Sequence, residues 1–336
     1  MPAEKGELMV ADNQRDMPTA AAKITDIEGL KVGTSEDMAA LTGCTIILVE
    51  EGAVCGVDVR GSAPGTRETD LLSPLNMMQQ VQAVLLTGGS AFGLDAAGGV
   101  MRYLEERGIG HPTGKTVVPI VPAAVLFDLN VGDYRVRPEG DMGYQACKKA
   151  GQKVSEGNVG AGTGATVGKI RGFEFCTKSG QGSHAVRLEN GLIVGALVAV
   201  NAFGDVVNPD SGEVIAGVRS ADGSGFVSTV QLWKQNPEIL APPINTNTTI
   251  AVVATNARLD KSQAAKVAQM AHNGMARTIS PCHTMFDGDT VFALATGQIE
   301  ADVNLVGVLA QEVLARAILR AVYTAETVQG LRCCRE

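Results

Sequence analysis

A threonine at the boundary between a polar loop and an apolar segment is the residue best suited to nucleophilic chemistry. Thr248 follows Asn247 shortly after Pro242-Pro243, and β-branched residues follow it directly, so it is expected to begin a strand. If the Asn247–Thr248 bond were cut, Thr248 would carry both a hydroxyl nucleophile and an α-amine. That amine titrates at about 7.7–8.0 in simple peptides, close enough to neutrality to act as a general base. An ordinary polar loop leading into a Thr-rich strand would show the same pattern.

Other polar residues could support such a nucleophile. Asp287 and Asp289 alternate with a glycine, so in an extended segment their carboxylates would share one face and could hold or orient the Thr248 hydroxyl or ammonium. Asn201 ends an apolar run and could donate its amide to an oxyanion. Lys169 could lower the pKa of the Thr248 amine, aid the oxyanion or pair with the aspartates. Taken singly, these residues also fit a solvated turn, a strand-end turn residue and a surface lysine.

Alternating strand and helix patterns must position these residues. Segments 45–49 and 54–59 flank Glu51-Gly52 and predict a β-hairpin, and segments 82–86, 192–200 and 290–295 predict buried strands. Helices are expected from Gly88-Gly89-Ser90 to about Gly108, from the N-cap Asp260, and over about 302–322. Helices covering packed sheets indicate an α/β or α+β fold. Without an internal repeat or a composition break, residues 1–336 are expected to form a single domain.

Composition narrows the function classes. The net charge of −8 argues against a nucleic-acid or anionic-membrane partner and mildly favours amine-bearing ligands. No apolar run approaches the ~18–20 residues of a membrane span, and the first residues lack an apolar signal core, so a cytoplasmic location is expected. The 7 scattered cysteines indicate reduced thiols, and the 4 histidines lack metal-ligand spacing, so no metal is expected.

The glycine-rich segments do not match the usual cofactor or hydrolase motifs. The stretch 160–169 fails as a Walker A loop because Ile170 follows Lys169 where Ser or Thr is needed, and its glycine spacing does not fit a Rossmann fingerprint. The segment 88–93 is not a nucleophile elbow, because Phe92 occupies the position of the second glycine. No cofactor is therefore predicted.

Several separated motifs resemble one family. They occur in the same order as in the DmpA-type aminopeptidases and, especially closely, their nylon-oligomer hydrolase relatives. The resemblance covers about Ile24 to Val322. It rests on the segments 86–94, 160–169, Asn247-Thr248-Thr249-Ile250, Thr255-Asn256 and 283–292.

The resemblance implies an N-terminal-nucleophile fold, a four-layer αββα sandwich made as an inactive precursor. The precursor would cut itself into an α chain of residues 1–247 and a β chain of residues 248–336 that stay together and assemble into homo-oligomers, here expected to be tetramers. Thr248 matches the nucleophile, Asp287 and Asp289 the supporting acidic pair, and Lys169 and Asn201 the remaining active-site positions.

Two aromatic side chains near these motifs require separate interpretation. Phe127 stands where relatives carry a Tyr thought to help position the substrate. Phe127 is therefore a substrate-binding candidate whose side chain lacks the hydroxyl of that Tyr. The resemblance gives His283 no catalytic role, and we interpret it as structural.

Several functions fit these residues. The leading interpretation is a self-processing amide hydrolase that acts on short amine-bearing peptides or amides through an acyl-enzyme. Hydrolysis of 6-aminohexanoate oligomers by the same mechanism is a close alternative. Acyl transfer of the ornithine acetyltransferase kind and a non-catalytic scaffold are more distant ones.

Overall fold

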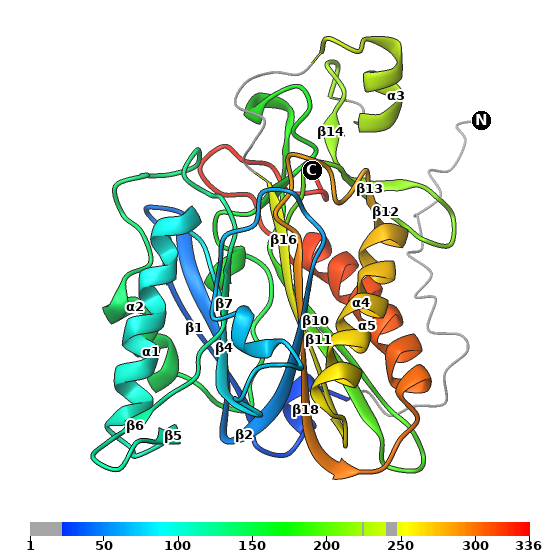
Figure 1. The fold of residues 1–336 in the computed structure, drawn as a ribbon. Helices are drawn as coiled ribbons and strands as arrows, with labels where there is room; N and C mark the ends of the chain where they lie inside the picture. The colour runs from blue at the N-terminus through cyan, green and yellow to red at the C-terminus, as the bar shows by residue number, and fades with distance from the viewer. Residues whose placement is uncertain (1–21, 224, 240–246) are drawn as a thin grey trace, which may run out of the picture.

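The computed structural model describes residues 22–223, 225–239 and 247–336, and its strands form two stacked sheets that share one long strand (Figure 1). The first sheet runs in the order β10 (Gln181–Arg187), β11 (Ile193–Asn201), β16 (Thr248–Ala257), β18 (Thr290–Ile299) and the second half of β2 (Thr42–Val59). The second contains β1 (Leu30–Asp37), the first half of β2, β4 (Val81–Thr87), β7 (Ala123–Val125) and β3 (Thr66–Arg67).

The other elements are helices and short strands around these sheets. The helices are α1 (Ala96–Glu105), α2 (Gly140–Lys148), α3 (Thr229–Gln235), α4 (Lys261–Thr278) and α5 (Val303–Tyr323). The 3-10 turns are η1 (Ile24–Asp26), η2 (Asp70–Leu72), η3 (Ser90–Asp95), η4 (Gly160–Gly162) and η5 (Phe173–Phe175). The short strands are β5 (His111–Pro112), β6 (Val117–Val118), β8 (Thr166–Val167), β9 (Thr177–Lys178), β12 (Asp205–Val207), β13 (Val214–Ala216), β14 (Val218–Arg219), β15 (Phe226–Val227) and β17 (Ile279–Ser280).

The hairpin predicted around Glu51-Gly52 is wrong. The chain continues through Gly52 as the single strand β2, and the pairing with β4 shifts register between Leu48 and Ala53. Gly52 has a φ of 88°, a left-handed conformation that a bulge requires and glycine adopts without a steric penalty. The chain therefore changes sheets at this point instead of reversing, and the first half of β2 forms its hairpin with β1.

Alternating side chains build three cores between four layers. In β11, Val194, Ala196 and Val198 pack toward α4 and α5, whereas Leu197 and Ala199 lie between the two sheets. On the outer side of the second sheet, residues such as Ile46 and Leu85 pack with Val100 and Leu104 of α1. Because strand side chains alternate with a period of two, each sheet contributes to two cores. The αββα sandwich is confirmed, with α1 and α2 on one outer face and α4 and α5 on the other (Figure 1).

Helix ends follow the expected chemistry. Asp260 caps α4 and forms a capping box with Gln263, and the Asp302 carboxylate accepts the N–H groups of Asn304 and Leu305 at the start of α5. None of the helices in the described ranges is long and apolar enough to cross a membrane.

Candidate active site

The sheet topology brings the predicted site residues to one end of the first sheet. Asn201, the last residue of β11, lies directly opposite Thr248, the first residue of β16. On the other side, β16 runs parallel to β18, and Asn247 forms a bridge with Asp287 just before that ladder begins. The sequence could not supply this register, since strand pairing depends on packing of the whole sheet.

Thr248 lies against the peptide carbonyl that precedes it. Its side chain is buried, with the residue only 4% exposed, and Oγ donates a hydrogen bond to the carbonyl oxygen of Asn247. The Gly288 N–H donates to the same oxygen at 3.1 Å. Two donors therefore converge on the carbonyl of the bond predicted to be cut. In the sequence pattern Gly288 is only a spacer between two aspartates, and nothing in its residue type indicates that its N–H reaches this carbonyl.

The Asp287 carboxylate binds both the segment that follows β11 and the turn that precedes Asp287 itself. It accepts the Phe203 N–H at 3.3 Å, the Thr284 N–H at 3.0 Å and the Thr284 hydroxyl at 2.5 Å. Burial, and then the nearby charge of Asp289, raise the pKa of Asp287 to about 6. A carboxyl with this pKa can exchange a proton near neutrality.

Asp289 connects the nucleophile strand to a histidine. One carboxylate oxygen accepts the Thr249 N–H at 2.7 Å, and the other accepts the N–H of His283 at 3.1 Å and faces its Nδ1 at 2.8 Å. Burial alone would lower the pKa of His283, but the hydrogen bond and charge of Asp289, together with Cys282, raise it to about 10. His283 is thus held as a cation against Asp289, with the edge-on ring of His272 at 4.8 Å between centroids.

The two carboxylates bind backbone groups on either side of Thr248. Among the described residues, neither forms a hydrogen bond to the Thr248 hydroxyl itself. The expected direct contact with that hydroxyl or its ammonium therefore stays a prediction for the cut chain.

Lys169 and Asn201 form a buried pair beside Thr248. Lys169 is 5% exposed, and its Nζ lies 3.0 Å from the Asn201 carbonyl oxygen and 2.7 Å from Oδ1. Burial lowers the pKa of Lys169 to about 7, although Cys176 and the two aspartates act in the opposite direction. The Asn201 amide also donates to the Phe127 carbonyl oxygen at 2.9 Å. The contact expected between the Asn201 amide and an oxyanion stays a prediction.

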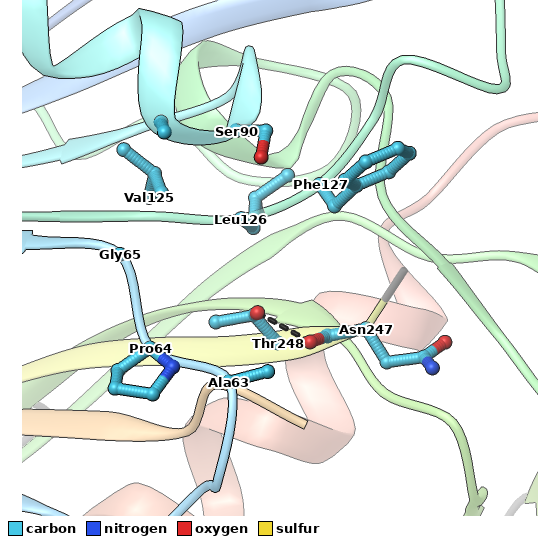
Figure 2. Close-up of a pocket in the computed structure, with 10 residues that line it drawn as sticks. Ala63, Pro64, Gly65, Ser90, Val125, Leu126, Phe127, Asn247 and Thr248 are labelled. Atoms are coloured by element: carbon cyan, nitrogen blue, oxygen red, sulfur yellow. Dashed lines mark hydrogen bonds between the residues drawn. The ribbon is translucent and has the colours of Figure 1, made fainter. Parts of the chain in front are cut away.

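A cavity of about 130 Å³ opens in front of Thr248 (Figure 2). Phe127 lies in its wall, and its substrate-binding role stays a prediction; Ser90 lies on the wall opposite Thr248. The sequence predicts for Ser90 only a place at the start of a helix. The lining residues are Ala63, Pro64, Gly65, Ser90, Ala91, Val125, Leu126, Phe127, Asn247 and Thr248.

Within the described ranges, no group of three or more His, Cys, Asp or Glu side chains is arranged to hold a metal ion. The functional groups around Thr248 are a hydroxyl, a backbone N–H, two carboxylates that accept hydrogen bonds and a lysine of lowered pKa, and all of these can take part in amide chemistry.

Comparisons with known proteins agree with this arrangement. The sequence pattern of peptidase family S58 matches residues 22–334. A protein named as an uncharacterized aminopeptidase of Mycobacterium leprae is 44% identical over 346 residues, covering 92% of each chain. The 6-aminohexanoate-oligomer endohydrolase of Paenarthrobacter ureafaciens is 30% identical over 312 residues, covering 88% of this chain and 84% of the relative.

Solved structures show the same fold at lower identity. The L-aminopeptidase D-Ala-esterase/amidase of Ochrobactrum anthropi, described as a variant of the Ntn hydrolase fold, superposes with a TM-score of 0.69 at 18% identity. The match covers 92% of this chain and 89% of that one. A Burkholderia sp. beta-aminopeptidase gives a TM-score of 0.68 at 21% identity, with 94% and 91% covered. Its fold is therefore that of the Ntn hydrolases, and the chain belongs to peptidase family S58, whose members hydrolyse peptide or amide bonds.

Proposed function

We propose that this chain cuts itself between Asn247 and Thr248 and that the freed Thr248 is the catalytic nucleophile. The observation that carries the proposal is the convergence of the Thr248 hydroxyl and the Gly288 N–H on the Asn247 carbonyl oxygen. The hydroxyl oxygen is adjacent to the carbon that it must attack, and the N–H can stabilise negative charge on the carbonyl oxygen. Reactants held in contact in this way gain effective concentration as well as orientation.

Self-cleavage then follows as an acyl shift and a hydrolysis. A bond forms between Thr248 Oγ and the Asn247 carbonyl carbon while the hydroxyl proton passes to a base. The carbon–nitrogen bond breaks, the Thr248 nitrogen takes a proton and becomes an amine, and an ester joins the two segments. Water hydrolyses this ester, leaving an Asn247 carboxylate and a free Thr248 with its hydroxyl restored.

Lys169 is the base that the site best supports for the first step. Its pKa of about 7 means that a large fraction of the amine is neutral near physiological pH. A neutral lysine amine carries a lone pair that can accept a proton, and this amine is held within hydrogen-bond distance of the two Asn201 oxygens. Asn201 pairs with Thr248 across the ladder, so the lysine that contacts Asn201 lies in the same part of the site as the hydroxyl.

In the cut enzyme, the α-amine of Thr248 can take over as base for attack on a substrate amide. The acyl group would transfer to Oγ, an amine would leave, and water would release the acid. Asp287 and Asp289, which already hold Phe203 and Thr249, would keep the new N-terminus in place and attract its positive charge.

The substrate that this site supports best is a short peptide or amide with a free amine. The cavity walls carry mostly small or apolar side chains, which fit a small acyl group, and the net charge of −8 favours a cationic substrate over an anionic one. The 30% identity to a 6-aminohexanoate-oligomer hydrolase supports that substrate as a second candidate. Acyl transfer to a second amine by the same ester is the more distant alternative.

We further propose assembly into a homotetramer of α/β pairs in the cytoplasm. Leu75 and Met77, two residues apart in the chain, are 95% and 72% exposed, and contact with another subunit would bury them. All seven cysteines are free thiols, as expected in a reducing compartment. Sedimentation velocity gives the assembly, and a monomer at micromolar concentration would contradict it.

Intact mass spectrometry after prolonged incubation tests self-cleavage directly. Wild type should give two chains that divide at Asn247–Thr248, and Thr248→Ala should remain a single chain, because only the threonine hydroxyl can attack the carbonyl. A wild-type chain that stays whole would refute the proposal.

Substrate class is tested next on the cut enzyme. Release of p-nitroaniline from amino-acid p-nitroanilides, without hydrolysis of aminohexanoate oligomers, would support an aminopeptidase. The reverse result would support the oligomer hydrolase. Acetyl exchange between acetylornithine and glutamate would indicate an acyltransferase.

A further inference from the structure

Ser90 is held in a conformation that serine rarely adopts. Its φ is 54°, and that of the preceding Gly89 is 79°, so two consecutive residues are left-handed. Glycine accepts this region freely, but a residue with a Cβ pays a penalty there. Such backbone persists where the surroundings enforce it, and it often occurs at functional sites.

The surroundings of Ser90 do enforce it. The Ser90 N–H donates to the Leu126 carbonyl oxygen at 3.0 Å, and the Gly89 N–H donates to the Asp128 carboxylate at 2.7 Å. Asp128 is 4% exposed and also accepts the Thr42 hydroxyl at 2.7 Å. The segment that carries Ser90 is thereby tied to the segment that carries the Phe127 wall of the cavity.

Close packing leaves this turn no room to relax. A Cβ on Gly88 would lie 2.0 Å from the Asp128 carboxylate and 2.7 Å from the Thr42 hydroxyl oxygen. The strained turn therefore has a fixed position relative to the cavity, and so has the side chain that it projects.

That side chain faces the nucleophile across the cavity. Figure 2 shows Ser90 above the cavity, with Thr248 on the opposite side and Phe127 at one end. Among the described residues, the Ser90 hydroxyl has no hydrogen-bond partner. Of the residues that line the cavity, Ser90, Asn247 and Thr248 carry polar side chains, whereas the others are glycine or apolar. Ser90 thus provides a side-chain donor on the wall opposite Thr248.

We propose that Ser90 is a substrate-binding residue whose hydroxyl donates a hydrogen bond to the carbonyl oxygen of the amide attacked by Thr248. This inference rests on the proposed function, because it places the amide between the two hydroxyls. A carbonyl oxygen in this largely apolar cavity must replace its lost water contacts. A donor that is held in place by a rigid, strained turn can also stabilise the negative charge that grows on this oxygen in the transition state, without having to reorganise.

The assay compares Ser90→Ala with Ser90→Gly, using alanine p-nitroanilide or the 6-aminohexanoate dimer, whichever wild type hydrolyses. Both variants lack the hydroxyl, but only glycine also relieves the strain of the left-handed backbone. Thermal melting of the two variants therefore shows whether a loss of stability is limited to the alanine variant. Ser262→Ala serves as the matched control, since Ser262 is an exposed serine on α4.

Both Ser90 variants should lose about 10- to 100-fold in kcat/KM, mostly through kcat, because an oxyanion donor acts more strongly in the transition state than in the ground state. Ser262→Ala should match wild type. Wild-type kcat in Ser90→Gly, or a loss confined to KM, would overturn the assignment. Failure of the proposed function can be distinguished from failure of the Ser90 assignment, because in the first case the wild-type protein itself would stay uncut or inactive.

Discussion

Gly288 provides a sharp test of self-cleavage, because its backbone rather than a side chain contacts the bond to be cut. We consider the substitution Gly288→Ala. A Cβ at this position would lie 2.6 Å from the Ala63 carbonyl oxygen and 2.8 Å from Thr248 Oγ. Both distances are far below ordinary carbon–oxygen contact, and one neighbour is backbone that cannot rotate away. Either the Gly288 N–H or the Thr248 hydroxyl must move.

The size of the effect follows from these contacts. Overpacking of this kind typically costs about 1–3 kcal/mol of folding stability, which a folded hydrolase of this length can survive. The rate should suffer more. Losing alignment of one oxyanion donor costs about 10²–10³ in rate, and a displacement of about 1 Å in a reacting group alone costs about 10². We therefore expect a folded protein whose self-cleavage is slower by at least about 10².

The assay follows the appearance of the two chains over time by intact mass spectrometry, with a thermal melt of the same sample. Gly98→Ala is the matched control: Gly98 is exposed on α1, and a Cβ there meets nothing within 4 Å. This control should cut normally and gain up to about 1 kcal/mol from helix propensity. Cleavage of Gly288→Ala at the wild-type rate would show that neither the N–H nor the position of the hydroxyl matters.

Two further predictions concern titrating groups. Because burial lowers the pKa of Lys169 to about 7, self-cleavage should accelerate from about pH 6 to about pH 8 as the amine becomes neutral. The Lys169→Met variant should cut slowly and show no such pH dependence. A wild-type rate that falls with rising pH would exclude Lys169 as the base. Burial lowers the pKa of His283, but the hydrogen bond and charge of Asp289 outweigh burial and raise this pKa from 6.5 to about 10. The ion pair between His283 and Asp289 therefore stabilises the fold fully below pH 6.5 and progressively less as pH rises through about 10. The deficit of His283→Gln in unfolding free energy, measured by chemical denaturation, should therefore shrink over that range, and a constant deficit would contradict the pairing.

Local patterns were sufficient to predict most of the layers. The apolar run that became β11 is buried on both faces, and Asp260 and Asp302 cap their helices as their residue types indicate. The hairpin predicted around Gly52 was wrong because a glycine in the left-handed conformation occurs both in hairpin turns and in bulges. Only the partners of the two halves of β2 distinguish these cases, and such partners are distant in the sequence.

The site was partly predictable for a similar reason. Thr248, Lys169, Asn201 and the two aspartates carry functional groups that suggest chemistry from residue type alone. The contributions of Gly288 and Ser90 were not predictable in this way. Gly288 acts through an N–H that every residue except proline possesses, and Ser90 is positioned by a turn that Asp128 fixes from 38 residues farther along the chain.

These missed residues indicate how the fold itself creates the reactive bond. The parallel pairing of β16 with β18 is preceded by the bridge between Asn247 and Asp287, and this bridge directs the next N–H, that of Gly288, at the Asn247 carbonyl. The antiparallel pairing with β11 places Asn201 and its bound Lys169 opposite Thr248. A mutation that shifts the register of β16 should therefore abolish cleavage even when every catalytic side chain remains, because the two ladders, rather than the side chains alone, align the attacking hydroxyl, the carbonyl and the base.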